Sequence, residues 1–114
     1  MQKDDLVYVG QMLDLAQKAA GKVEGITRDD YDRDENLRLA LVHLIQTLGE
    51  AARKVSPPFH QAHPEIPWAA IIGMRHRVVH DYLHVDFDIV WGVTAVDLPP
   101  LTGKLRALVP GEGG

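Results

Sequence analysis

The stretch "DENLRLALVHLIQTLGEAARKV", from Asp34 to Val55, has the clearest helical pattern in the chain. Its apolar residues recur in alternating steps of four and three, which places them along one side of a helix. The residues of this seam are Leu37, Leu41, Leu44, Leu48, Ala51 and Val55. We expect the seam to pack against other helices, in a bundle core or at a dimer interface. Gly49 costs this helix about 1 kcal/mol relative to alanine, which predicts close approach of another backbone.

The sequence on both sides of this segment predicts further helices and no convincing strand. With approximate bounds, the expected helices are Asp4–Ala20, Asp34–Val55, Trp68–Val79 or His80, Asp86–Asp97 and Leu101–Leu108. The polar connector "GITRDDYDRDE" is predicted to be a solvated loop, and the prolines of "SPPFHQAHPEIPW" interrupt the helical pattern. Pro99 and Pro100 are expected to separate the last two helices. We therefore predict an all-α antiparallel bundle of four to five helices, as one domain over residues 1–114 with a frayed tail at 109–114.

The composition limits the kinds of protein that this chain can be. Of its 114 residues, 46% are hydrophobic and 25% are charged, which is typical of a globular protein. The formal net charge of -4 argues against a protein that coats nucleic acid, so any such contact needs a local basic patch. The absence of cysteine excludes disulfides and thiolate metal clusters. The charged start "MQKDDLVYVG" and the lack of a long apolar run predict a cytoplasmic protein with no membrane partner.

The stretch "GMRHRVVHDYLH", Gly73 to His84, gathers two arginines, three histidines and a tyrosine. On a helical wheel Arg75 falls within the apolar face of the predicted third helix, one turn from Ile71 and from Val79. An unpaired buried charge is very costly, so Arg75 must meet a carboxylate, a ligand anion or a solvent-filled groove at an interface. Glu50 is the carboxylate that a purely structural role would use.

His80 is the second candidate in this stretch. On an ideal helix Arg75 and His80 point about 140° apart, so a straight helix would not aim both at one atom. If the helix ends near His80, the histidine can turn toward Arg75; alternatively, a second copy of the chain supplies the missing half. Arginine binds phosphate bidentately and histidine moves protons near neutral pH, so the pair suits phosphodiester chemistry. The residues alone leave open that both merely rim a bundle.

A metal site is the rival interpretation of the same histidines. His76, His80 and His84 are spaced by four, and such a ladder can ligate zinc or nickel on one helix. Only Asp81 or Asp86 could complete the set nearby, and the helix is expected to end inside the ladder. We therefore predict neither a metal nor another cofactor, and keep a metal-binding protein as the weaker alternative.

The run from Leu48 to Leu101 resembles the HepT-like branch of the HEPN superfamily. The most specific parts of the resemblance are "GEA", "PEIPW", "GMRHRVVHDY" and "VDFDIVW", in this order and spacing. A weaker resemblance continues through the first two helices. It implies an all-α HEPN-type bundle that forms a homodimer, and a toxin that is one half of a toxin–antitoxin pair. Such toxins are metal-independent endoribonucleases in which both copies of the motif line one cleft.

The resemblance also implies roles for individual residues. HEPN ribonucleases carry an arginine, a spacer of four to six residues and a histidine, which here are Arg75 and His80. A tyrosine stands two residues after the histidine in the HepT-like branch, and Tyr82 matches it. The cognate antitoxin resembles a minimal nucleotidyltransferase and can transfer AMP from ATP to this tyrosine, which silences the toxin.

Three further residues of this stretch are expected to have supporting roles, and a second class of function is possible for the chain. Asp81 is expected to orient His80 or to cap a turn, whereas His76 and Arg77 are expected to contact RNA at most. The RNA substrate would be a tRNA or an mRNA. The alternative to a ribonuclease is a non-catalytic HEPN module that binds a nucleotide or the nucleotidyltransferase, with Arg75 holding a phosphate or a partner carboxylate.

Overall fold

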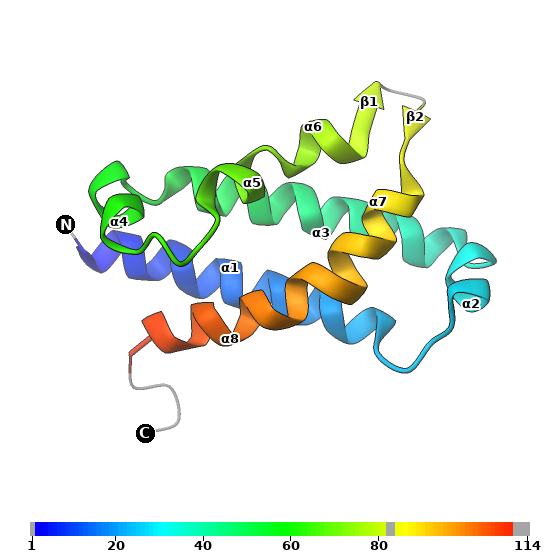
Figure 1. The fold of residues 1–114 in the computed structure, drawn as a ribbon, viewed down its shortest axis with the longest axis horizontal. Helices are drawn as coiled ribbons and strands as arrows, with labels where there is room; N and C mark the ends of the chain where they lie inside the picture. The colour runs from blue at the N-terminus through cyan, green and yellow to red at the C-terminus, as the bar shows by residue number, and fades with distance from the viewer. Residues whose placement is uncertain (1, 82–83, 111–114) are drawn as a thin grey trace.

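Two long antiparallel helices form the centre of the molecule. A computed structural model describes residues 2–81 and 84–110, and in it α1 (Gln2–Val23) and α3 (Glu35–Lys54) lie side by side over most of their lengths (Figure 1). The bounds of α3 confirm the predicted helix, because the side chain of Asp34 caps it by accepting from the backbone N–H of Leu37 at 3.0 Å. The first helix runs three residues beyond its predicted end, through Gly21, and the left-handed turn follows at Gly25 (φ 79°).

The close approach predicted at Gly49 is confirmed. A Cβ atom built on Gly49 would lie 3.2 Å from the carbonyl oxygen of Ile71, which belongs to α5 (Trp68–Ile72). The helix backbones therefore come together at the one position of α3 that has no side chain. The seam of α3 is also buried as predicted, with Leu37 only partly so and the other members in the core: Leu41, Leu44, Leu48, Ala51 and Val55.

The connector before α3 corrects the prediction of a solvated loop. It contains a short helix, α2 (Arg28–Asp32), which begins with a capping box: the Thr27 hydroxyl accepts from the Asp30 N–H, and the Asp30 carboxylate accepts from the Thr27 N–H. Tyr31 within it is completely buried. The proline-rich segment likewise forms a short helix, α4 (Pro57–Ala62), because its prolines occupy the first turn, where no N–H partner is needed.

The predicted third helix is broken into two and ends early. After α5 the chain bends at Gly73, and α6 (Met74–Val78) is followed by two short antiparallel strands, β1 (Val79–Asp81) and β2 (His84–Val85). The prediction of no strand was therefore wrong at this hairpin. Ile71, Met74 and Val78 form a continuous buried apolar face. Arg75 was expected to lie on this face but is exposed.

The C-terminal part of the chain is one long helical run. It comprises α7 (Phe87–Gly92), the π-helical segment η1 (Val93–Asp97) and α8 (Leu98–Leu108), so the expected break at Pro99 and Pro100 is absent. The wider π-helical turns lie where the proline rings would otherwise meet the carbonyl groups of the preceding turn. This run crosses the bundle, with α8 against α1 and α7 against α3 (Figure 1).

The described residues thus form the all-α fold that was predicted, with a small hairpin added. Residues 111–114 of the expected frayed tail lie outside the described part, and the assignment of one domain to the whole chain stays a prediction. Within the described part, none of the helices combines the length and the apolar character needed to span a membrane.

The helix α2 is fastened to the start of α7. The Tyr31 hydroxyl donates to the carbonyl oxygen of Phe87 at 2.7 Å, and its ring lies 4.9 Å from that of Trp91. Arg28 donates to the carboxylates of Asp32 and Asp88 and so joins the two helices at the surface. The connector between α1 and α3 therefore helps to hold the start of α7, which directly follows the hairpin in the sequence.

Because the phenol of Tyr31 is buried, the stability of this fold should decrease at alkaline pH. Burial raises the pKa of Tyr31 to about 12 from its ordinary value of 10.0. The unfolded chain therefore loses this proton first, and the free energy of unfolding should fall as the pH rises from about 10 toward 12. Tyr31→Phe should be less stable by about 1 kcal/mol at pH 7 but should lose less stability above pH 10. The free energy of unfolding of both proteins is measured with urea at pH 7 and at about pH 10.5–11, which lies just above the ordinary tyrosine pKa of about 10. An equal loss of stability in both proteins between the two pH values would contradict the prediction.

Candidate active site

The hairpin brings together the two residues that the sequence singled out. Arg75 lies on α6, which ends at Val78, and His80 lies on β1, so they no longer share a straight helix. Both line one cavity of about 470 Å³. The remaining walls are Val42 and Gln46 of α3, His76 of α6, Val79 of β1 and Val85 of β2. The helix was expected to end near His80 and ends slightly earlier, at Val78, and this end is what allows both side chains to reach the same space.

Two local features end the helix at this point. Val79 adopts an extended backbone (φ -111°, ψ 104°), which is the conformation that β-branched residues favour. The N–H of Asp86 then donates to the carbonyl oxygen of Val78 at 2.7 Å, which takes up an acceptor that the helix end leaves free. The strands pair Val79 with Val85 and Asp81 with His84. The hairpin thus holds His80 beside the end of α6.

Arg75 faces open space rather than a structural partner. Its side chain is exposed, and among the described residues no carboxylate lies within ion-pair distance of it. Glu50, the acid that a structural role would have used, lies instead 3.8 Å from Arg53. Arg75 is therefore exposed at a cavity, and the interface that was expected to cover it stays a prediction. A guanidinium without a protein carboxylate is suited to bind an anion.

Asp86 is a site residue that the sequence reasoning considered only as a metal ligand. One of its carboxylate oxygens caps α7 by accepting from the N–H groups of Asp88 and Ile89, each at 3.1 Å. Its other oxygen, Oδ2, lies 3.9 Å from Nε2 of His80. This distance is too long for a hydrogen bond but short enough for electrostatic attraction to a protonated imidazole. The signal available in the sequence was a capping aspartate before the helical run "FDIVWG".

The other predicted residues are not all at the cavity. His76 lines it, whereas Arg77 is exposed on α6 and does not. Asp81 belongs to β1, and only its backbone is described. Tyr82 lies outside the described residues. Within the described ranges, no three histidine, aspartate or glutamate side chains are grouped closely enough to hold a metal ion.

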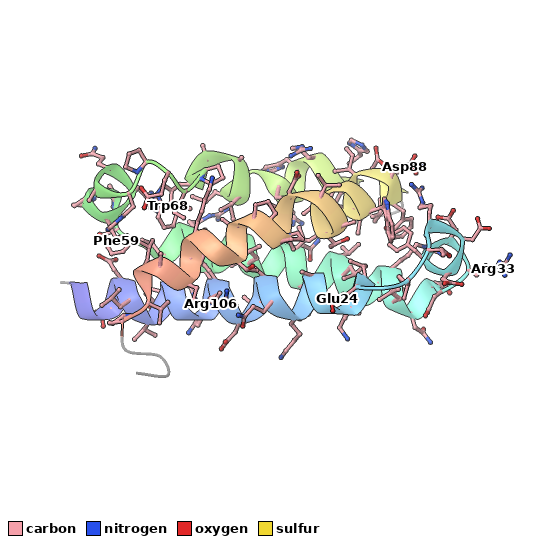
Figure 2. All side chains as sticks on the ribbon, turned by 60° about the horizontal axis from the view of Figure 1, so that its bottom comes forward. Glu24, Arg33, Phe59, Trp68, Asp88 and Arg106 are labelled. Carbon is pink, nitrogen blue, oxygen red and sulfur yellow. The ribbon has the colours of Figure 1, made fainter. Side chains whose placement is uncertain are left out.

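The cavity lies toward the end of the molecule that carries the start of α7. Figure 2 shows Asp88 at this end, with Arg33 of the α2 region nearby, and Phe59 and Trp68 at the opposite end. The aromatic cluster around Phe59 is thus remote from Arg75 and His80. It includes His60, whose ring stacks on Trp68 with centroids 4.4 Å apart, so this histidine serves packing.

The chain is similar to proteins of a known family. The model of the ribonuclease HepT-like family matches residues 12–108. The chain belongs to this family. Membership confirms the resemblance to HepT-like proteins and supports ribonuclease activity, while the individual site residues of this HepT-like chain stay predictions.

Two curated relatives that are named as ribonucleases match this chain over nearly their whole lengths. A Thermococcus cleftensis protein, named as a candidate HepT ribonuclease, is 29% identical over 106 residues, which cover 93% of this chain and 94% of that protein. A Caldanaerobacter subterraneus protein, named as a candidate RNase, is 28% identical over 105 residues, covering 92% of this chain and 94% of that one. None of the solved structures compared gives a significant match.

The capping role of Asp86 can be separated from its charge. Asp86→Ala removes the oxygen that accepts from Asp88 and Ile89, and should lower the free energy of unfolding by about 1 kcal/mol. Asp86→Asn keeps an oxygen there and should cost only a fraction of this. Asp97→Ala is the control, because Asp97 is an exposed aspartate that also precedes a helix but makes no capping hydrogen bond. Urea unfolding midpoints measure all three; an Asp86→Ala midpoint no lower than that of the control would contradict the role.

Proposed function

We infer that this HepT-like chain is a metal-independent endoribonuclease that acts in the cytoplasm as the toxin of a toxin–antitoxin pair. The observation that carries this inference is the shared cavity of Arg75 and His80, in a chain whose family and relatives are ribonucleases. An exposed arginine without a carboxylate partner and an exposed histidine beside it supply an anion-binding group and a proton-transfer group. These are the two groups that cleavage of RNA by its own 2′-hydroxyl requires.

The proposed reaction needs no metal. His80 accepts the proton of a ribose 2′-hydroxyl while that oxygen forms a bond to the adjacent phosphorus. The bond from phosphorus to the 5′-oxygen of the next nucleotide breaks, and that oxygen takes a proton from the solvent or from the imidazolium. Arg75 binds the phosphate and stabilises the charge that grows on its oxygens. The carboxylate of Asp86 stabilises the imidazolium while His80 holds the extra proton.

A homodimer is part of this proposal. The cavity is lined on one side by Val42 and Gln46 of α3 and is open to solvent at Arg75 and His80. The resemblance to HEPN ribonucleases implies that two copies of this motif share one cleft. In the proposed dimer a second copy covers this face, so that two copies of Arg75 and His80 line one cleft.

Removal of either site residue should abolish cleavage while the protein stays folded. Arg75→Ala should slow RNA cleavage by about 100- to 1000-fold, by analogy with the loss of an oxyanion-stabilising donor, and His80→Ala should do the same through the lost proton transfer. Arg106→Ala is the control, because Arg106 is exposed on α8 at the far end from Asp88 (Figure 2). Cleavage of tRNA and mRNA is measured in the presence of EDTA. Intact RNA with the native protein, or equal rates in all variants, would overturn the proposal.

We also propose that a nucleotidyltransferase antitoxin silences the toxin by transferring AMP from ATP to Tyr82. The phenol oxygen of Tyr82 bonds to the α-phosphorus of ATP, the bond from that phosphorus to the β-phosphate bridge breaks, pyrophosphate leaves, and the phenol proton passes to the solvent. The added phosphate would bring bulk and negative charge next to the cleft and repel RNA. After incubation with ATP and the nucleotidyltransferase from the neighbouring reading frame, the native chain should gain the mass of one AMP and lose activity. Tyr82→Phe should gain nothing; Tyr31 offers no alternative target because it is completely buried. Modification of the Tyr82→Phe protein would contradict this assignment.

A further inference from the structure

A second cavity adjoins the one that contains Arg75. Its volume is about 620 Å³, and it shares His80 and Val85 with the first cavity. Its other walls are Leu39 of α3, His84 of β2, and Asp86, Phe87 and Asp88 at the start of α7. His80 therefore stands on the boundary between two spaces, and a molecule bound at His80 can extend into both.

The two cavities differ in the charged side chains that line them. Among the described residues, the first is lined by Arg75, His76 and His80 and by no carboxylate. Of the described residues around the second, Asp86 and Asp88 are carboxylates, His80 and His84 are histidines, and none is a lysine or arginine. A phosphate is attracted into the first cavity and repelled from the second. The part of a nucleotide that suits the second cavity is thus its uncharged base.

The second cavity also offers apolar surface on which a base can lie. Leu39 is 52% exposed, although most large apolar side chains of this protein are buried. The ring of Phe87 is partly exposed and also lines this cavity, and the guanidinium of Arg38 lies 5.0 Å from the ring centre. Bases of single-stranded RNA are bound through such aromatic and apolar side chains.

We propose that this second cavity, the base pocket, holds the nucleobase next to the scissile phosphate and prefers guanine. The preference follows from its carboxylates, which only accept hydrogen bonds when ionised. Asp88 is held by Arg28 through Oδ1, which leaves its second oxygen for a ligand. Guanine presents two neighbouring N–H donors on one edge, whereas uracil presents one donor between two carbonyl oxygens that carboxylates repel. Adenine and cytosine each present one amino group, so their affinity should lie between those of guanine and uracil. This inference rests on the proposed ribonuclease function.

The cleavage experiment compares two variants that each remove one carboxylate partner of Arg28. Asp88→Asn and Asp32→Asn each remove a carboxylate to which Arg28 donates, but only Asp88 lines the base pocket. Cleavage sites in an RNA of random sequence are mapped by sequencing. The native protein and Asp32→Asn should cut next to guanine about tenfold more often than next to uracil, which corresponds to one charge-assisted hydrogen bond. Asp88→Asn should lose most of this preference. The same base preference in all three proteins would overturn the proposal.

A binding experiment keeps the base pocket testable apart from catalysis. Guanosine and uridine 3′-monophosphates are titrated into the native protein while the methyl NMR signals of Leu39 are followed. Guanosine monophosphate should bind about tenfold more tightly and shift the Leu39 signals, and Asp88→Asn should weaken this binding. Val96, which is 66% exposed but lines a different cavity, is the control and should not shift.

The two experiments distinguish the possible failures. If no RNA is cleaved but the guanosine nucleotide shifts Leu39, the base pocket stands and the ribonuclease function falls. If RNA is cleaved with an Arg75-dependent rate and neither nucleotide shifts Leu39, the base pocket falls and the ribonuclease function stands. If the nucleotide shifts Leu39 but a single-stranded RNA does not displace it, the cavity takes free nucleotides and the assignment to the RNA base is overturned.

Discussion

The candidate site depends on the position of Asp86. The backbone N–H of this residue holds the end of α6 through Val78, one carboxylate oxygen starts α7, and the other oxygen faces His80. Three elements thus meet at a single residue. Because α6 carries Arg75 and β1 carries His80, the relative placement of the two groups is set by where Asp86 joins the helices. The hairpin is short, and a short hairpin is not stable by itself. Its geometry therefore comes from this junction and from the packing of α6 and α7 against α3.

Long elements could be predicted from the sequence because their pattern is local. The helix α3 was found with nearly its observed bounds, and Gly49 was correctly interpreted as a point of close approach, here to the carbonyl of Ile71. For the short helix α2 the capping pair Thr27 and Asp30 was a local signal that was not used, and its packing could not be found in this way. It is held by contacts made by Tyr31 with Phe87 and Trp91, residues more than fifty positions away. No pattern within the connector itself contains that information.

The sequence singled out candidate site residues but not their geometry. Arg75 and His80 were named from chemistry and resemblance, and they do line one cavity. The helical wheel placed Arg75 on the apolar face because it assumed a straight helix through Gly73. The bend there separates α5 from α6, so Arg75 is exposed instead of buried. Asp86 was missed because its nearness to His80 arises from the turn of the hairpin, which the sequence pattern did not reveal.

The exposure of Arg75 also bears on how a dimer would respond to its ligand. In the proposed cleft, two Arg75 guanidinium groups approach each other with no carboxylate of either described chain to neutralise them. Like charges at short range repel strongly once water is excluded, so the empty cleft is electrostatically unfavourable. An RNA phosphate between the two arginines reduces this repulsion. The arginines then bind the transition state more tightly than the substrate, because the negative charge on the phosphate grows during the reaction. In the proposed regulation, the phosphate of an AMP group attached to Tyr82 competes with RNA for the positive charge of the two arginines. The proposed modification then blocks substrate binding by neutralising the charge that this binding requires, as well as by occupying space.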